Sequence, residues 1–551
     1  MTVMKSSCRC ACVLMSLTGL ANAAAVECTL EQRRALVPSA DEIRGHRETP
    51  LPEIGYPLGT RRDHWRFDLI VRVNAAGRVE CYDEPPPSDW PESQRGIEGP
   101  RRAVIDGLDD WRYTPFLRDG RPVPVVITES LREYELPGAH RALPEVPLDK
   151  VRIALDRSGC FGTCPDYHVE LFGDGRAVFT GNAFTAVRGS HAYAVEPAKV
   201  AALVERLRSS DVWSARTVYR AGVTDNPTYT LRIQLGKSVR EIEDYVGAWV
   251  GMPPAIEEFE DAVDAAAGSS DFIHFSTHAL DVLRREGFHF DSPEGAKLLS
   301  RAVNDDEMAD DAALARLVEL GAPLVPPEAG DGYGMSGPPG PPLLAALGYR
   351  RAKTVEALLA RAAVYSNGRP DQAKIDAAFQ AAIGGGDLAL VERIWGIEGD
   401  NPHPSMTFED VVDGADDSQP KVRKSVDVIL LLAGDHGRQA GERIAIARFL
   451  ASHGSDLRAT RAKGNTLLHS AAYADDVEFV RFLLSKGLDP SAVDSDGITP
   501  LGSTQSEEVA MLLLEAGSDV GKMNSADYSF RRFVQSNGWY RVLAWLDAHG
   551  G

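Results

Sequence analysis

The sequence predicts a multidomain chain in which two small α+β domains precede an all-α solenoid of helical repeats. Three observations lead to this prediction. Alternating apolar residues and turn signals dominate 60–268, helical periodicity dominates 288–551, and a motif near the C-terminus recurs after 33 residues. A chain of 551 residues also exceeds the roughly 300 residues at which single cores stop growing.

The first 23 residues have the features of an export signal. Lys5 and Arg9 precede a short apolar run at 11–17, and small residues lead up to a cleavage site at Ala23. The run is too short to cross a bilayer, which needs about 20 residues. We therefore expect cleavage after Ala23, a periplasmic or secreted mature chain and no membrane span. A segment without a regular pattern, 24–59, follows.

The composition argues against several classes of function. The formal net charge is -21, and it becomes -23 once the signal takes away two positive charges and no negative ones. A chain this acidic binds nucleic acids and anionic membranes poorly, so we expect neither as a partner. The sequence contains no P-loop and no dinucleotide fingerprint. We assign no cofactor and no catalytic residue.

Residues 60–138 predict a small α+β domain. Alternation and turn signals place strands near 67–73, 79–81 and 125–131 and a helix near 103–108. This order, with a Trp-x-Tyr-x-Pro step at 111–115 and a Gly-x-Pro-Val entry at 120–123, resembles the C-terminal domain of TonB energy transducers. The resemblance implies a module for contacts with periplasmic proteins.

Residues 148–268 predict a second α+β domain. Strands are expected near 151–155, 169–172, 177–181 and 231–235, and helices near 197–208 and 256–263. A Cys-x-Gly-x-Cys-Pro-x-Tyr motif at 160–167, a Gly-Asp-Gly turn and a Thr-Asp-x-Pro-Thr motif at 224–228 resemble a bacterial domain family of unknown function. Members of that family are often exported and joined to other modules, so the resemblance implies a fold and no mechanism.

The C-terminal half carries the most diagnostic pattern. The segment 464–472 recurs in part from residue 497, and an amphipathic helix pattern at 477–487 lies between the two copies. This spacing and order resemble ankyrin repeats, in which a hairpin loop and two antiparallel helices form a unit of 33 residues. The resemblance implies a solenoid over 288–551 that binds a protein partner. The earlier units are degenerate, and we expect about six in all.

The resemblance also implies roles for single residues. Thr466 and Thr499 take the position of helix N-caps. His469 takes the position of a histidine that ties neighbouring loops by a hydrogen bond and has no part in catalysis. The tip of the best-defined loop supplies the candidate partner-binding residues, which favour a basic patch on the partner: Asp489, Asp494, Ser495 and Asp496.

Four of the seven cysteines remain after signal cleavage, namely Cys28, Cys81, Cys160 and Cys164. Cys160 and Cys164 have three intervening residues in a glycine-rich loop, whereas a thioredoxin-like redox pair has two at a helix start. A structural disulfide is therefore the favoured interpretation over a redox pair. A metal site would need further ligands at suitable spacing, and none follows. Cys28 and Cys81 are left to pair by default.

The sequence favours an exported, non-catalytic adaptor that binds a periplasmic protein through the solenoid. Two alternatives remain open. An immunity-type inhibitor of a periplasmic toxin would have an effector gene beside its own. An enzyme centred on the middle domain would need a cleft around Asp225 and Tyr167 with perturbed titration. His274 and His278 lie one helical turn apart in the predicted linker, but the glutamate of a metalloprotease helix is missing, so we assign no metal site.

Overall fold

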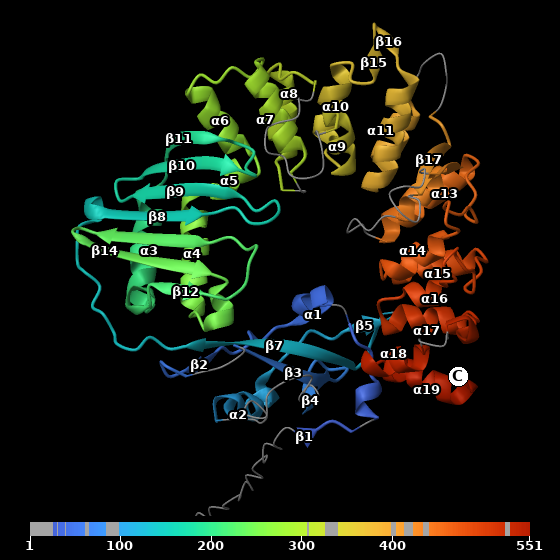
Figure 1. Ribbon diagram of the computed structural model, residues 1–551, viewed down its shortest axis with the longest axis horizontal. Helices are drawn as coiled ribbons and strands as arrows, with labels where there is room; N and C mark the ends of the chain where they lie inside the picture. Colours follow the sequence, from blue (N-terminus) through green and yellow to red (C-terminus); the bar gives the residue numbers. More distant parts are fainter. Residues whose placement is uncertain are drawn as a thin grey trace, which may run out of the picture. The chain divides into compact units, whose positions relative to one another are not determined.

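The computed structural model describes the ranges 26–29, 31–38, 40–60, 65–83, 99–118, 120–305, 308–325, 340–397, 404–412, 422–433, 440–523 and 529–550 (Figure 1). The predicted export signal lies outside these residues. The chain divides into two compact units, of which the first comprises Met1–Arg33, Pro38–Leu51 and Asp68–Glu129, and the second comprises the remainder. None of the helices described is long and apolar enough to cross a membrane.

The N-terminal region is a mixed α/β structure. Its elements are β1 (Val26–Glu27), η1 (Gln32–Arg34), α1 (Ala40–His46), β2 (Ile54–Tyr56), β3 (Arg66–Val73), β4 (Val79–Asp83), α2 (Gly99–Asp106), η3 (Leu108–Asp110), β5 (Leu117–Arg118), β6 (Arg121–Pro122) and β7 (Val125–Glu135). Five strands form one sheet in the order β1-β4-β3-β7-β2. The predicted strands are present as β3, β4 and β7.

The segment 24–59, which the sequence predicts to be irregular, contains β1, α1 and β2. The two strands are only two and three residues long. Both pair in parallel with distant strands, β1 with β4 and β2 with β7. Strands this short show no alternation in the sequence, because their order comes from pairing with residues far along the chain.

The middle region contains a seven-stranded sheet in the order β11-β10-β9-β8-β13-β14-β12. Its elements are η4 (Leu148–Lys150), β8 (Val151–Arg157), β9 (Asp166–Phe172), β10 (Arg176–Ala183), β11 (Gly189–Ala194), α3 (Pro197–Ser209), η5 (Val212–Ser214), β12 (Val218–Arg220), β13 (Tyr229–Leu235), β14 (Ser238–Tyr245), η6 (Gly247–Val250) and α4 (Pro254–Ala267). The helices α3 and α4 lie together on one face of this sheet (Figure 1).

The two faces of this sheet differ because successive side chains of a strand point to opposite sides. Ile153, Leu155 and Val169 are fully buried beneath the helices. The other face carries cross-strand polar pairs, such as the hydrogen bond between the Nδ1 of His168 and the Oδ1 of Asp156 at 2.8 Å. A sheet of this kind needs helices on one side only, and the other side stays polar.

The C-terminal half is helical. Its elements are α5 (Ser269–Ile273), α6 (Thr277–Arg285), α7 (Pro293–Val303), α8 (Asp311–Glu319), α9 (Pro342–Gly348), α10 (Ala352–Ala360), β15 (Tyr365–Ser366), β16 (Arg369–Pro370), α11 (Gln372–Gly385), α12 (Leu388–Trp395), β17 (Thr407–Val412), β18 (Val422–Asp427), η7 (Val428–Ala433), α13 (Ala440–Ser452), α14 (Leu467–Tyr473), α15 (Val477–Ser485), α16 (Pro500–Ser503), α17 (Glu507–Glu515), η8 (Val520–Met523), α18 (Phe530–Ser536) and α19 (Tyr540–His549). From α7 onward the helices follow one another as stacked pairs (Figure 1).

The boundary between the middle region and the solenoid is not the linker that the sequence predicts. The residues after α4 form α5 and α6, which contact strands β10 and β11 of the sheet. Arg301 of α7 donates from Nε to the carbonyl of Ala186 at 2.8 Å, and the Nδ1 of His274 lies 2.8 Å from Asp305. Sheet and solenoid therefore share one continuous apolar core.

Candidate functional site

Hydrogen bonds between neighbouring hairpins order the best-defined repeats. Thr466 caps α14 by accepting the N–H of Leu468, and its own N–H donates to the Nδ1 of His469 at 3.2 Å. The other ring nitrogen of His469, Nε2, then carries the proton and donates to the carbonyl of Ile498 at 3.1 Å. Burial lowers the pKa of His469, which favours the neutral ring. The predicted role of His469 in tying two loops is confirmed.

Asp494, one of the four candidate partner-binding residues, is engaged within the protein. Its Oδ1 accepts the N–H groups of Asp496 and Ile498 at 2.9 and 2.8 Å. Its Oδ2 accepts the side-chain amide of Asn465, from the preceding hairpin, at 2.9 Å. These bonds shape the loop and join two repeats, so both carboxylate oxygens of Asp494 have a structural role.

The other three candidates lie exposed on the hairpin 487–499. Asp489 accepts the N–H of Ser491 at 2.8 Å through Oδ1, which leaves its Oδ2 on the surface. Ser495 is fixed by its backbone, since its N–H donates to the carbonyl of Lys463 at 2.8 Å. Asp496 is exposed. The structure therefore brings Asp489, Ser495 and Asp496 to the surface of one rigid hairpin.

The same hairpin exposes apolar side chains that the sequence-based prediction missed. Val493 is 49% exposed and Ile498 is 43% exposed, and Tyr473 at the end of α14 is 61% exposed. An apolar side chain at the tip of a polar loop has no packing role, and it is the signal that could have revealed this feature. Groups of exposed apolar residues with a polar rim are typical of interaction sites.

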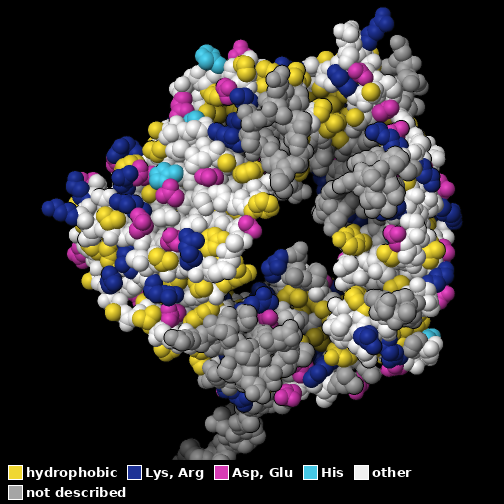
Figure 2. All heavy atoms as spheres, viewed as in Figure 1, with side chains coloured by type: hydrophobic (Ala, Val, Ile, Leu, Met, Phe, Trp, Pro, Cys, Tyr) yellow, Lys and Arg dark blue, Asp and Glu magenta, His cyan; other side chains and the backbone are white. Residues whose placement is uncertain are grey.

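The charge around the hairpin is mixed rather than purely acidic. The preceding hairpin exposes Arg458 and Lys463, and the Nζ of Lys522 donates to the carbonyl of Ser491. Acidic and basic side chains are likewise interspersed on the face shown in Figure 2. The basic patch predicted on the partner stays a prediction.

Asp225 and Tyr167, the two residues on which an enzyme centred on the middle domain would depend, form no hydrogen bond with each other through their side chains. Tyr167 is buried, and its hydroxyl donates to the Oδ2 of Asp264 at 2.7 Å. Asp225 is exposed in the loop before β13, where its Oδ2 accepts the hydroxyl of Thr224 at 3.0 Å. Backbone bonds bring the two motif loops side by side, as the N–H of Phe161 donates to the carbonyl of Asp225. Neither side chain shares a hydrogen bond with the other.

Perturbed titration occurs instead inside the domain, at Glu260 of α4. This residue is 4% exposed, and its Oε1 has no hydrogen-bond partner in the structure. Burial is the main cause that raises the pKa of Glu260 to about 9, and nearby carboxylates add to the shift: Asp244, Glu257, Asp261 and Asp264. A carboxyl group packed this deeply has no access to a substrate in this conformation.

Asp264 lies one turn after Glu260 on the same helix. Burial raises its pKa, while the hydroxyls of Ser269 and Tyr167 oppose that rise. The two carboxyl groups thus lie in the interior beside the sheet. In the residues that the structure describes, no group of three or more His, Cys, Asp or Glu is arranged to hold a metal ion.

The structure pairs all four cysteines of the predicted mature chain. Cys28 follows β1 and Cys81 lies in β4, with their Cα atoms 5.0 Å apart. Cys160 and Cys164 close the loop between β8 and β9, with Cα atoms 5.5 Å apart. Both sulfur pairs lie at bonding distance, as the disulfide prediction requires.

His274 and His278, which are spaced by one helical turn in the sequence, do not lie on one continuous helix. Phe275 adopts a left-handed conformation with a φ of 59°, which separates α5 from α6. The ring of His278 packs edge-on against Phe272, with 6.1 Å between centroids. The Nδ1 of His274 instead lies at hydrogen-bond distance, 2.8 Å, from the Oδ2 of Asp305.

Comparison with known proteins agrees with this architecture. Residues 151–267 match a domain of unknown function (DUF6438), and residues 438–524 match the family model for ankyrin repeats in three copies. The solenoid contains ankyrin repeats. Among solved structures, the chain is similar to the ankyrin repeat domain of Bcl-3, a member of the IkappaB protein family. That likeness has 18% identity and a TM-score of 0.24, and covers 46% of this chain and 96% of that one. No curated protein matches the sequence.

Proposed function

We propose that the protein is an exported, non-catalytic adaptor that binds a periplasmic protein through its ankyrin repeats. The observation that carries this proposal is the rigid hairpin 487–499, whose exposed Val493 and Ile498 lie among the polar residues Asp489 and Asp496. Stacked repeats offer a continuous surface of such hairpins, which suits recognition of a protein better than chemistry on a small substrate.

The hairpin surface suggests the chemistry of its partner. Apolar side chains at the centre of an interface supply most of the binding free energy, and charged residues at the rim influence mainly the rate of association. The complementary surface is accordingly an apolar depression with a few Lys or Arg residues at its edge. In the immunity-type alternative the same surface would bind a toxin, so the two functions differ in the identity of the partner.

Export is supported by the sequence of the first 23 residues and by the two cysteine pairs, because disulfides persist in oxidising compartments. The order β3-β4-α2-β7 agrees with the resemblance of residues 60–138 to the C-terminal domain of TonB proteins. We propose that this module makes further contacts with periplasmic proteins. The sheet and helices of the middle region serve as the scaffold from which the solenoid extends.

Intact-mass measurement of the protein from its native host tests export and pairing together. We expect a mass that lacks residues 1–23 and that is lower by four hydrogens than the fully reduced chain, because two disulfides form. Alkylation should label no thiol until the protein is unfolded and reduced. A chain that retains its first 23 residues in the cytoplasm, or thiols alkylated in the native state, would contradict export and pairing respectively.

Substitutions on the hairpin test the binding function. We expect the double variant Val493→Ser/Ile498→Ser to lower capture of the partner from periplasmic extract by tenfold or more, because it removes the apolar centre. Quantitative mass spectrometry of the captured protein is the measurement. Asp489→Asn/Asp496→Asn should lower capture by a few-fold at low salt and have little effect at high salt.

The matched control carries the same number of changes on the second helices of two repeats, where Glu478 and Glu515 are exposed. Glu478→Gln/Glu515→Gln alters the net charge as the aspartate variant does, and it should leave capture unchanged. Asp494 is retained in every variant because it holds the loop together. Full capture by Val493→Ser/Ile498→Ser would show that another surface binds the partner.

A further inference from the structure

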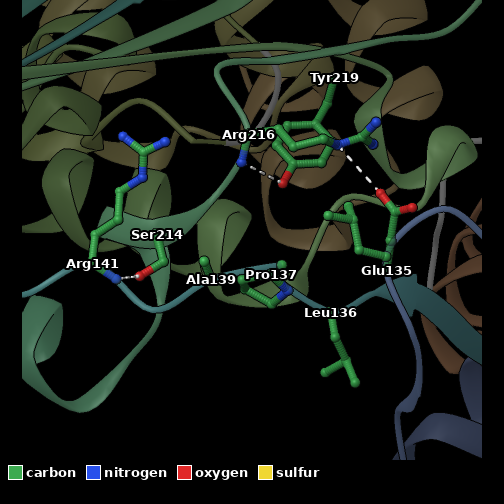
Figure 3. A pocket seen from close by; sticks show the side chains of 10 residues that line it. Glu135, Leu136, Pro137, Ala139, Arg141, Ser214, Arg216 and Tyr219 are labelled. Carbon is green, nitrogen blue, oxygen red and sulfur yellow. Dashed lines mark hydrogen bonds and ion pairs between the residues drawn. The ribbon is translucent and has the colours of Figure 1, made fainter.

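A small cavity lies where the chain leaves β7 and runs along the middle region. Its volume is about 170 Å³, and Figure 3 shows its lining from close by. Leu58, Leu136 and the ring of Tyr219 form apolar walls, and Arg141, Arg216 and Glu135 supply the charged groups. Leu58 and Leu136 are both exposed, although each is a large apolar side chain. Neither the proposed ankyrin interface nor the buried carboxyl groups involve this cavity.

The one carboxylate of the cavity is already neutralised. The Oε1 of Glu135 accepts the N–H of Gly59 at 2.5 Å, and its Oε2 lies 3.4 Å from the Nε of Arg216. The guanidinium of Arg216 also lies over the ring of Tyr219, 4.6 Å from its centroid. Arg216 and Glu135 therefore form an ion pair on one wall of the cavity, which the dashed line in Figure 3 marks.

The positive charge on the opposite wall is not neutralised. Arg141 is held by its backbone, whose N–H donates to the Oγ of Ser214 at 2.8 Å, and its guanidinium has no hydrogen bond or ion pair among the described residues (Figure 3). Asp211, the nearby acid, pairs with His140 and accepts the hydroxyl of Ser214. Arg141 thus lines the cavity and is exposed, and its guanidinium has no partner among the described residues.

A second arginine increases this excess of positive charge. Arg240 donates from Nη2 to the carbonyl of Ala215, but its Nε is buried without a hydrogen-bond partner. Burial lowers the pKa of Arg240, and the positive charge of Arg141 lowers it further. Arg141 and Arg240 form no ion pair with an acid among the described residues, and this excess of positive charge favours the binding of an anion.

We propose that this cavity binds a carboxylate that carries one short apolar group, as found at the C-terminus of a peptide with an apolar last residue. Arg141 binds the carboxylate, Arg240 adds to the positive field, and the apolar group packs against Leu58 and Leu136. The size agrees with this class. Cavities near 150 Å³ hold a benzene-sized group, whereas drug-sized ligands and cofactors occupy about 300–1,000 Å³.

Calorimetric titration of the full mature chain with four small probes tests this site. We expect N-acetyl-leucine to bind, and N-acetyl-leucinamide, acetate and inorganic phosphate to bind at least tenfold more weakly, because each lacks the carboxylate or the apolar group. A Gly-Gly-Leu peptide distinguishes the source of the ligand. Tighter binding than N-acetyl-leucine assigns the site to peptide C-termini, and equal binding assigns it to small carboxylic acids. Both results support the site.

Variants locate the binding on the two walls. Arg141→Gln should weaken N-acetyl-leucine at least tenfold, and Leu58→Ser/Leu136→Ser should do the same while circular dichroism stays unchanged. Arg208→Gln is the control, since Arg208 is an exposed arginine on α3 that pairs with Glu205. Equal affinity for the acid and its amide would overturn the proposal. Equal affinity for phosphate, or an unchanged affinity of Arg141→Gln for N-acetyl-leucine, would also overturn it. So would the absence of binding at about 50 mM probe, because a concentration of that order detects even ligands that bind more weakly than about 1 mM.

Discussion

Replacing Glu260 by glutamine is expected to make the middle region much less sensitive to alkaline pH. In the folded protein the pKa of Glu260 is raised to about 9, while in the unfolded chain it ionises near its ordinary value of 4.5. Between these values the folded state holds one proton more than the unfolded state. The free energy of unfolding therefore falls as pH rises, by up to roughly 1.4 kcal/mol per pH unit from this one group.

The free energy of unfolding falls with rising pH because the pKa of Glu260 is higher in the folded state than in the unfolded chain. The favourable contribution of the protonated carboxyl is fully present below pH 4.5, and it is lost as the pH rises toward 9. Glu260→Gln cannot ionise and so lacks this slope. Asp244 and Asp264 also have raised pKa values and remain in both proteins, so the difference between the two curves reports Glu260 together with its coupling to these two carboxylates.

The measurement is urea denaturation with pulse proteolysis from pH 5 to 9, in which peptides from residues 151–267 report on the middle region. The wild-type midpoint should fall relative to that of Glu260→Gln at each step. The control is Glu258→Gln, on the same helix, where the side chain is exposed and pairs with Arg206. Parallel curves for wild type and Glu260→Gln would show that Glu260 is ionised, and therefore solvated, in the folded state.

The position of Glu260 within an apolar pattern of the sequence indicates that this carboxyl group is buried. Ile256, Phe259 and Val263 predict the buried face of α4, and Glu260 lies on that same face, one turn after Ile256. A glutamate in the middle of an apolar stripe is seldom exposed. The burial of Glu260 is therefore predictable from the sequence. The lack of a hydrogen-bond partner for its Oε1 is not, because it depends on how α4 packs against β8 and β9.

Local patterns predicted the long strands and helices well. β8 and β13 alternate, α3 has its apolar residues on one side, and the 33-residue spacing identifies the last repeats. What failed was the region between domains. The sequence pattern predicts a linker where α5 and α6 form, because the buried partners of these helices lie on the sheet and on α8, far along the chain. Pairing of Cys28 with Cys81, 53 residues apart, similarly depends on β1 joining β4.

The sequence predicts where the candidate hairpin lies, whereas the hydrogen bonds of its side chains depend on the folded loop. The repeat spacing located the exposed hairpin, and the acidic residues on it were assigned as contacts. Asp494 is used for loop geometry because its carboxylate can reach N–H groups two and four residues ahead. Sequence alone does not distinguish such a side chain from a free one such as Asp496. Exposure of Val493 depends likewise on the tertiary structure of neighbouring hairpins.

The stability of that hairpin is expected to depend on a buried ion pair outside it, between Arg443 of α13 and Asp476 before α15. Both side chains are nearly inaccessible, at 4% and 10% exposure, and the Nη1 of Arg443 lies 2.9 Å from the Oδ2 of Asp476. The geometry of this contact is that of an ion pair without a hydrogen bond to Oδ2. Asp476 also caps α15, since its Oδ1 accepts the N–H of Phe479 at 2.9 Å. Asp476 therefore both caps the N-terminus of α15 and faces the buried charge of Arg443.

Asp476→Ala removes both functions and deprives the buried guanidinium of this carboxylate, so we expect a loss of about 3–5 kcal/mol in the free energy of unfolding of the repeats. Asp476→Asn keeps the cap and removes the charge. It should account for most of the loss, because a helix cap alone contributes about 1 kcal/mol. Hydrogen exchange of α13–α17 in the full chain is the measurement, and capture of the partner should fall together with protection of these helices.

The charge contribution can be separated from the cap by a double variant. Arg443→Met/Asp476→Asn removes both charges and keeps the cap, and it should recover most of the stability that Asp476→Asn loses, because the guanidinium is removed together with the carboxylate that faces it. Glu319→Gln, which breaks the exposed pair of Arg316 and Glu319 on α8, should cost less than about 1 kcal/mol. If Asp476→Asn cost no more than Glu319→Gln, the pair of Arg443 and Asp476 would not stabilise the repeats that present the binding hairpin.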